Sequence, residues 1–360
     1  MEIIVEKYIL VINPGSTSTK VAIYNKDKEL WTESIEHNIK QLDKFANISD
    51  QYEFRKKNIV DSIIKNNFDF KKLECVIGRG GVGIKPVKSG GYIVNDVMVN
   101  RLKNNPLIEH ASNLGALIAS DIADEIGCNA YIYDPVATDE FTDISRISGL
   151  PEVPRYSAFH ALNSRAMAMK TAEEKKINYN ESNFIVAHLG GGISMCVLEK
   201  GRAIDICADD EGPFSPERAG AVPCNKLVDI CYNGGYEYKE MKKRLRGKGG
   251  IRAYLNTTDL KDVCSRVEQG DKEATLIIDA MIYQIAKAIG ALATTLCGKI
   301  DYIIITGGVA YDKYIVNEVE KRVKFIAPVK ILPGENEMMA LANGAYRIIK
   351  GEESAQEYTD

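Results

Sequence analysis

Short apolar segments bounded by glycine and polar residues alternate with longer segments in which apolar residues recur every three or four positions. The first pattern predicts buried β-strands, and the second predicts amphipathic helices. The expected strands span residues 8–12, 20–24, 30–35, 75–77, 130–133, 184–187, 193–198 and 302–305. The expected helices span residues 54–66, 110–126, 157–175, 275–297 and 337–350. This alternation of strands and helices predicts an α/β fold.

Two stretches of the chain follow one plan. Residues 8–28 and 184–202 each contain an apolar strand, a turn of small residues, a second strand and a charged turn. An apolar strand that ends in paired glycines follows each hairpin, at residues 76–81 and 304–308. Any glycine-rich hairpin could share the first feature alone. Two hairpins, each followed by its own strand with paired glycines, predict two duplicated α/β lobes.

The length of the chain and its charge narrow the classes of protein to be considered. At 360 residues the chain is expected to form about two domains. Its 46 Lys and Arg residues are balanced by 50 Asp and Glu residues, which leaves a net charge of −4. This balance provides no basic surface for nucleic acid or for an anionic membrane, so neither partner is expected.

Three features predict a cytoplasmic protein without a disulfide or metal scaffold. The N-terminus includes Glu2 and Glu6 and leads directly into a strand, unlike a signal peptide. The eight cysteines include no CxxC pair, and most lie in apolar segments, as reduced core thiols do. The apolar stretch 275–297 contains Asp279 and Lys287 near its centre, which predicts a helix buried between lobes and not a membrane span.

Glycine-rich turns follow the apolar strands at three places. Residues 13–20 (NPGSTSTK) offer backbone amides, four hydroxyls, an amide side chain and an ammonium group, which together can cradle a phosphate. The spacing differs from the Walker A phosphate loop, and an ordinary polar hairpin turn remains an alternative. The three glycines at 190–192 predict close approach of a ligand, for which a phosphate chain is the natural candidate. By the same reasoning, the glycine pair at 307–308 predicts close approach at the nucleoside end.

The order of these motifs along nearly the whole chain resembles the acetokinase family, and within it the kinases of butyrate and branched-chain acids. The resemblance is carried by NPGSTSTK at 13–20, GRGG at 78–81, HxxNL at 110–114, YDP at 133–135, RYxxFH at 155–160, HLGGGIS at 188–194, SPERAG at 215–220 and TGGV at 306–309. Each motif alone is weak, but their collinear order is specific. The resemblance implies the fold of the sugar kinase, Hsp70 and actin superfamily, in which two duplicated lobes enclose a cleft that binds ATP.

By this resemblance, residues 1–154 together with 337–360 would form the lobe that binds the acyl substrate, and residues 155–336 would form the nucleotide lobe. The protein would transfer the γ-phosphoryl group of Mg²⁺-ATP, reversibly and in line, to a short-chain carboxylic acid. The products would be ADP and an acyl phosphate, and the protein would be a homo-oligomer. Two alternatives stay open: a kinase for acetate or propionate, and a non-catalytic ATP-dependent switch of the Hsp70 type.

The resemblance also assigns roles to single residues near the reacting groups. Arg79 would hold the acyl carboxylate, and Arg218 would hold the transferring phosphoryl group. His160 would steady the phosphoryl oxygens in the transition state. Asp134 would position His160 or the metal.

The remaining implied roles concern the nucleotide and its metal ion. Asn13 and Glu337 would hold the Mg²⁺-phosphate end, with Glu335 as the alternative carboxylate. The other contacts to the nucleotide would come from Gly15, Ser16, Thr17, Lys20, His188, Gly190, Gly191, Gly192, Arg252, Gly307 and Gly308.

These roles agree with the chemistry of the reaction. A carboxylic acid with a pKa near ~4–5 is already ionised at neutral pH and needs no general base. Two like unit charges ~4 Å apart repel by about 4 kcal/mol even at an effective dielectric constant of about 20, so the site must above all neutralise charge. Arginines and Mg²⁺ meet this need. Arg79 and Arg218 both lie in glycine-rich surroundings, although a surface ion pair is an alternative for either.

The sequence departs from acetate kinases at two points. Acetate kinases carry bulky valines directly after the arginine that matches Arg79, where this chain has Gly80 and Gly81. The smaller residues are expected to leave room for a longer acyl chain, which favours four-carbon or branched acids. In the segment that would flank adenosine, only the arginine of an Asp and Arg pair is present, as Arg252.

Overall fold

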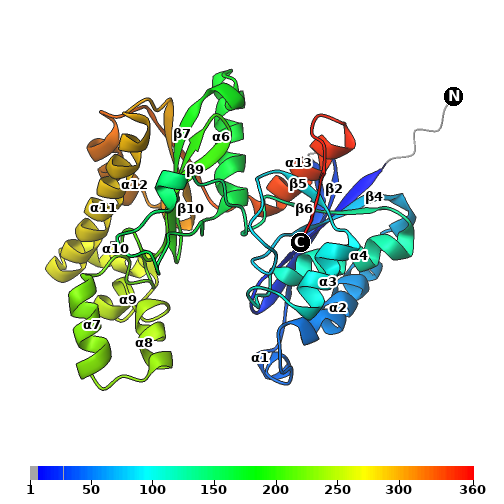
Figure 1. Ribbon diagram of the computed structural model, residues 1–360, viewed down its shortest axis with the longest axis horizontal. Helices are drawn as coiled ribbons and strands as arrows, with labels where there is room; N and C mark the ends of the chain where they lie inside the picture. Colours follow the sequence, from blue (N-terminus) through cyan, green and yellow to red (C-terminus); the bar gives the residue numbers. More distant parts are fainter. Residues whose placement is uncertain (1–6, 27) are drawn as a thin grey trace. The chain divides into compact units, whose positions relative to one another are not determined.

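The computed structural model describes residues 7–26 and 28–360, and the chain divides into two compact units. Unit 1 is Met1–Asp139 together with Asn336–Asp360, and unit 2 is Glu140–Glu335. In Figure 1 the colours run from blue to cyan, with red, through unit 1 and from green to orange through unit 2.

The division follows Asp139, whereas the sequence analysis placed it after residue 154. Phe141 is buried in a core of unit 2 that also contains Phe159. The backbone N–H of Ala203 donates to the Glu140 carboxylate at 2.9 Å. These contacts attach the segment that follows Asp139 to unit 2.

Unit 1 is built on a seven-stranded mixed sheet with the strand order β12-β5-β6-β4-β1-β2-β3. Strands β1, β2 and β3 form an antiparallel meander, and β4 and β6 continue the sheet parallel to β1. The strands are β1 Tyr8–Pro14, β2 Ser18–Asn25, β3 Lys28–Glu36, β4 Leu73–Arg79, β5 Gly91–Ile93, β6 Asn129–Tyr133 and β12 Gln356–Glu357.

Helices cover both faces of this sheet. Helix α4 packs on the face that carries Leu10, Ile12 and Val76. Helix α13 packs on the other face, where a Cβ on Gly344 would lie 2.5 Å from the Tyr133 ring. The helices are α1 Ile39–Leu42, α2 Tyr52–Lys65, α3 Asp96–Asn104, α4 Asn113–Ile126 and α13 Glu337–Ile349, with 3-10 turns Ser49–Gln51 and Phe70–Lys72.

Unit 2 has a five-stranded sheet with the order β11-β10-β7-β8-β9. Its strands are β7 Asn183–Leu189, β8 Ile193–Glu199, β9 Arg202–Cys207, β10 Tyr302–Gly307 and β11 Val329–Pro333. Strands β7, β8 and β9 form an antiparallel meander, and β10 and β11 run parallel to β7. The strands β6-β4-β1-β2-β3 of unit 1 have the same order and the same directions, so the predicted duplication is confirmed.

The helices of unit 2 also lie on two faces. Helix α6 covers the face that carries Phe184 and Val186, and α11 and α12 cover the face that carries Ile185 and Ile303. The helices are α5 Asp143–Arg146, α6 Ala161–Lys175, α7 Cys224–Asn233, α8 Tyr238–Leu245, α9 Ile251–Leu255, α10 Leu260–Glu268, α11 Lys272–Ala293 and α12 Lys313–Val323, with 3-10 turns Tyr179–Glu181, Thr294–Leu296 and Gly308–Tyr311.

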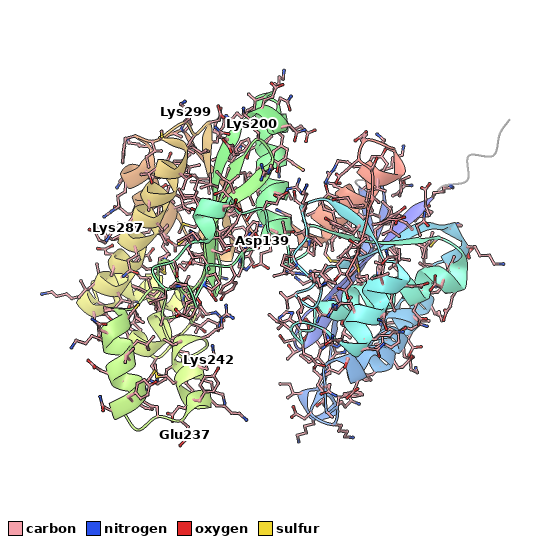
Figure 2. The ribbon with its side chains drawn as sticks, in the orientation of Figure 1. Asp139, Lys200, Glu237, Lys242, Lys287 and Lys299 are labelled. Atoms are coloured by element: carbon pink, nitrogen blue, oxygen red, sulfur yellow. The ribbon has the colours of Figure 1, made fainter. Side chains whose placement is uncertain are left out.

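Helix α11 is long and apolar enough to cross a membrane by length and composition. Its buried face, which includes Ile278, Ile282 and Ile285, packs into the core of unit 2. Lys287 lies on the exposed outer side of the helix, where Figure 2 shows its side chain pointing away from the sheet. These contacts identify α11 as a core helix of unit 2.

Two predicted helices begin later than expected. The helix expected from residue 110 begins at Asn113, because His110 Nδ1 accepts a hydrogen bond from the Ser112 N–H and forms a local turn. The helix expected from residue 157 begins at Ala161. The backbone N–H of His160 donates instead to Ser194 Oγ at 3.3 Å, which fixes this residue against β8.

Candidate active site

The strand register of unit 1 brings Asn13 and Arg79 together. Ile12 of β1 is paired with Gly78 of β4, so the next residue on each strand lies at the same edge of the sheet. Both side chains point to the face opposite α4, because successive residues of a strand alternate between faces. Lys20 of β2 is paired directly with Asn13 and therefore shares this face.

Glu337, the first residue of α13, joins these two side chains. Its Oε2 accepts a hydrogen bond from Asn13 Nδ2 at 2.8 Å and also pairs with the Arg79 guanidinium. The Arg79 side chain is 22% exposed and that of Glu337 is 12% exposed, so the ion pair is only partly open to solvent. Unit 1 thus brings together three residues that the sequence analysis proposed from distant parts of the chain.

Two glycines allow α4 to lie directly behind Arg79. A Cβ on Gly78 would lie 2.1 Å from the carbonyl oxygen of Gly115, and a Cβ on Gly115 would lie 2.5 Å from that of Arg79. Neither position can hold a side chain without moving backbone. The close packing of α4 on β4 therefore holds the strand end that carries Arg79.

Neighbouring residues occupy the space that was expected for the acyl chain beside Gly80 and Gly81. A Cβ on Gly80 would lie 2.4 Å from Pro135 Cβ, and a Cβ on Gly81 would lie 2.1 Å from Asn113 Oδ1. The small residues let neighbouring segments approach the chain and leave no cavity at their Cβ positions. The prediction that they make room for a longer acyl chain is therefore wrong at these two positions.

Arg55 binds the turn of residues 13–20 through the turn's backbone carbonyl oxygens. This residue was not predicted from the sequence. Arg55 is completely buried. Its guanidinium donates to the carbonyl oxygens of Gly15 at 2.7 Å, Ser16 at 2.8 Å and Ser18 at 3.1 Å. The Gly15 N–H is used within the turn, where it donates to the Ser18 carbonyl at 2.8 Å. Ser16 and Thr17 form the outer part of the turn.

Arg55 carries a buried positive charge at this turn. Burial lowers the pKa of its guanidinium to about 10, so the group remains charged at neutral pH. The burial of Arg55 could have been predicted from its position, because it lies four residues before Ile59 on the apolar face of α2. A charged residue at a buried position of an amphipathic helix indicates a specific polar partner.

Asp134 follows the end of β6 and is buried. Its backbone has φ +41°, a conformation that is unfavourable for most non-glycine residues. Its Oδ1 accepts a hydrogen bond from the Gly90 N–H at 2.7 Å. The carboxylate therefore orders the turn that leads into β5.

The candidate site of unit 2 is built on a row of polar residues across three strands. His188 of β7 is paired with Ser194 of β8 on one side and with Thr306 of β10 on the other. All three side chains lie on the face covered by α6, whose first turn carries Asn163. His160 immediately precedes this helix.

The rings of His160 and His188 are stacked. Their centroids are 3.8 Å apart and their planes differ by 9°. His160 Nδ1 lies 2.7 Å from Ser194 Oγ, and His188 Nδ1 lies 2.9 Å from Asn163 Nδ2. Ser194 and Asn163 thus hold the two rings face to face.

Arg218 lies beside the glycine run that follows β7. Its Nε is 3.2 Å from Asp209 Oδ2, and its Nη1 is 3.4 Å from Glu217 Oε1. The buried Nε has no aligned hydrogen-bond partner among the residues that the structure describes. A Cβ on Gly192 would lie 3.6 Å from this Nε, so the glycine run and the guanidinium are neighbours.

A cavity of about 740 Å³ opens next to the glycine run in unit 2. It is lined by Gly190, Gly191, Pro216, Glu217, Thr258, Asp259, Leu260, Lys261, Gly308, Val309, Tyr311, Asp312 and Glu335. Three of the glycines expected at the nucleotide are in this lining, and a Cβ on Gly308 would meet nothing within 4 Å. The segments 258–261 and 311–312 were not anticipated from the sequence.

Four other unit 2 residues expected at the nucleotide lie outside the lining of the cavity: His188, Gly192, Arg252 and Gly307. Gly307 has φ +92°, and a Cβ there would lie 2.3 Å from the Leu189 carbonyl oxygen, so this glycine serves the packing of β10 on β7. Arg252 is exposed and donates from Nη1 to the Gly247 carbonyl at 3.1 Å.

The two candidate metal carboxylates belong to different units. Glu335 lines the cavity of unit 2 and lies 3.4 Å from His188 Nε2, whereas Glu337 lies with Asn13 and Arg79 in unit 1. Residues 7–26 and 28–360 contain no group of three or more His, Cys, Asp or Glu side chains arranged to hold a metal ion.

The sequence and the fold were compared with those of known proteins. The model of the acetokinase family matches residues 151–357. The chain is 47% identical over 352 residues to butyrate kinase 1 of Clostridium acetobutylicum, with 97% of this chain and 99% of that protein covered. Its fold is similar to that of Porphyromonas gingivalis acetate kinase, with a TM-score of 0.77, 19% identity, and 94% and 99% of the two chains covered.

A kinase of another class has a similar fold. The ROK hexokinase of Thermus thermophilus is similar with a TM-score of 0.50 and 12% identity, with 96% of this chain and 99% of that chain covered. These structural similarities confirm the predicted α/β fold, which the chain shares with an acetate kinase and a ROK hexokinase. The match of the family model and the full-length identity to a butyrate kinase together establish that the chain belongs to the acetokinase family.

Proposed function

We propose that this protein is a butyrate kinase, which transfers the γ-phosphoryl group of ATP to butyrate or a similar short-chain acid. The observation that carries the proposal is the 47% identity to a butyrate kinase over nearly the full length of both chains. Membership of the acetokinase family implies the use of ATP. The products are ADP and an acyl phosphate, and the reaction is reversible.

In this proposal Arg79 binds the acid. A carboxylate oxygen attacks the γ-phosphorus, the new P–O bond forms as the bond to the β-γ bridging oxygen breaks, and ADP leaves with that electron pair. The acid is already ionised, so no proton has to be removed. The Arg79 guanidinium is suited to bind a carboxylate, because it presents several donors in one plane. It already pairs with the carboxylate of Glu337.

Arg218 acts on the transferring group. Its buried Nε–H lacks an aligned acceptor among residues 7–26 and 28–360, and a phosphoryl oxygen would supply one. Asp209 and Glu217 hold the guanidinium from two sides, which fixes its direction before substrate binds. His160 is held by Ser194 and would donate to the same phosphoryl group.

The cavity of unit 2 is the proposed nucleotide site. Glycines at 190, 191 and 308 leave its wall free of side chains, so a phosphate chain can approach the backbone closely. Asp259 caps the start of α10 through the Lys261 N–H and keeps this part of the lining in place.

Mg²⁺ is proposed to bind at Asn13 and Glu337 of unit 1, in the manner usual for nucleotide-dependent enzymes. Such ions are held by one or two protein carboxylates together with phosphate oxygens and water. Asn13 and Glu337 would hold the ion, with Glu337 supplying the carboxylate and Asn13 a side-chain carbonyl. When bound, it neutralises charge on the phosphates.

We also propose a cytoplasmic location and a homo-oligomeric state. All eight cysteines are free thiols, as expected in a reducing compartment. Cys224, Cys231 and Cys297 are exposed, so not all of them serve as the core thiols that the sequence pattern indicated.

The proposal is tested by trapping the acyl phosphate with hydroxylamine. The purified protein is incubated with Mg²⁺-ATP, hydroxylamine and one acid of a C2 to C5 panel, straight and branched. We expect hydroxamate to form, with the largest kcat/KM for butyrate or a branched relative. A preference for acetate or propionate would favour a kinase for those acids. Folded protein that forms no hydroxamate with any acid would favour the ATP-dependent switch.

A further inference from the structure

Asn163 of helix α6 is buried against strands β7 and β10 of unit 2. None of the catalytic or binding roles described so far involves it. It is completely buried in the first turn of α6. Its Nδ2 lies 2.9 Å from His188 Nδ1 and 3.3 Å from Thr306 Oγ1. Thr306 Oγ1 in turn donates to the Gly334 carbonyl at 3.2 Å.

This chain of hydrogen bonds determines which nitrogen of His188 carries the proton. The single hydroxyl proton of Thr306 is used at the Gly334 carbonyl, so Thr306 Oγ1 can only accept from Asn163. The amide of Asn163 must therefore present its NH₂ group to both neighbours. His188 Nδ1 then accepts a hydrogen bond, which leaves the proton of the neutral ring on Nε2.

The Nε2 of His188 is directed toward the proposed nucleotide site. It is buried and has no hydrogen-bond partner among the described residues. A Cβ on Gly190, which lines the cavity, would lie 3.5 Å from it. Glu335 Oε1, which is also in the lining, lies 3.4 Å from His188 Nε2. An N–H left without an acceptor beside such a wall is available to an anionic ligand.

We propose that Asn163 is a positioning residue that holds His188 as the Nε2–H tautomer, so that the ring donates to a phosphate oxygen of the nucleotide. In the opposite tautomer a lone pair would face the phosphate and repel it. Asn163 thus acts through His188 and touches no substrate itself. This inference rests on the proposed function only in naming the nucleotide as the ligand.

The tautomer can be read directly by NMR. In protein labelled with ¹⁵N-histidine, long-range ¹H–¹⁵N spectra distinguish a protonated ring nitrogen from an unprotonated one. The chain has only four histidines, and the His188 signals are assigned from their loss in His188→Gln. At neutral pH we expect a protonated Nε2 and an unprotonated Nδ1. A protonated Nδ1 in the unmodified protein would overturn the inference without any other variant.

Asn163→Asp then tests the consequence for binding. A carboxylate at this position accepts a hydrogen bond from Nδ1, so we expect the single ring proton to move from Nε2 to Nδ1. We also expect the Kd for ATP, measured by calorimetry, to rise about 10-fold, while KM for butyrate stays within about 2-fold. Ser164→Ala is the matched control, because it removes a buried hydroxyl from the same turn of α6 and leaves Asn163 in place.

The outcomes separate this inference from the proposed function. An unchanged tautomer in Asn163→Asp, or an unchanged Kd for ATP despite the changed tautomer, would contradict the role of Asn163. If Asn163→Asp does not fold, the spectrum of the unmodified protein still decides. If no acid yields hydroxamate but ATP binding depends on Asn163 as expected, the proposed function fails and the inference stands.

Discussion

Replacing Arg218 with alanine is expected to lower kcat for butyrate phosphorylation about 10²–10³-fold, the usual cost of removing one donor that stabilises developing charge. The guanidinium pairs with Asp209 and Glu217, and its buried Nε–H lacks an aligned acceptor in the part of the chain that the structure describes. Its main contribution should therefore appear when the phosphoryl group arrives. KM for butyrate should change much less than kcat.

The control for Arg218 is Arg322→Ala. Arg322 also belongs to unit 2 and pairs with Glu318, but it lies on the solvent side of α12. We expect kcat of this variant to remain within about 2-fold. Near-normal turnover of Arg218→Ala would show that Arg218 forms only an ion pair with Asp209 and would remove its proposed role.

Arg79→Ala is expected to act mainly on the acid. Loss of a charge-assisted hydrogen bond to the carboxylate costs about 1.5–3 kcal/mol, which corresponds to a rise of about 10- to 150-fold in KM for butyrate. The Kd for ATP should change less than KM for butyrate, because the proposed nucleotide cavity is lined by unit 2 residues. Initial rates at varied butyrate and fixed ATP measure the effect.

The alternative for Arg79 is a purely structural ion pair with Glu337. In that case Arg79→Ala would lower the melting temperature and leave KM for butyrate unchanged. Arg101→Ala is the matched control, because Arg101 also lies in unit 1 and also pairs with a carboxylate, that of Asp360. We expect it to change stability without changing KM for either substrate.

The duplication of the fold could be predicted from the sequence because it is a local pattern repeated twice. The hairpins and the strands that end in paired glycines recur in the same order, and both sheets have the topology that this order implies. The boundary between the units was harder to place. It depends on where Phe141 packs, and that contact joins segments far apart in the chain.

The candidate site was predicted in part for the same reason. Asn13 lies one residue before the end of β1 and Arg79 ends β4, so strand pairing brings them together. The position of Glu337 could be predicted because it is the first residue of a helix. The packing of backbone around Gly80 and Gly81 could not be predicted, because a missing side chain can leave a cavity or admit a neighbouring segment. Here Pro135 and Asn113 occupy the space.

Arg55 and Asn163 were missed because their partners lie on other elements. Arg55 binds carbonyl oxygens of a turn about forty residues earlier in the chain. Asn163 reaches His188 and Thr306 through strand register, which one sequence does not reveal. A charged or amide residue on the buried side of a helix was the available signal in both cases.

The central claim is tested most directly by ³¹P NMR with butyrate labelled with ¹⁸O in both carboxylate oxygens. Incubated with Mg²⁺-ATP, the protein should form ADP and butyryl phosphate in equal amounts, and the phosphorus resonance of butyryl phosphate should carry the isotope shift of one bridging ¹⁸O. Release of inorganic phosphate at a rate independent of butyrate, with no butyryl phosphate formed, would contradict the account.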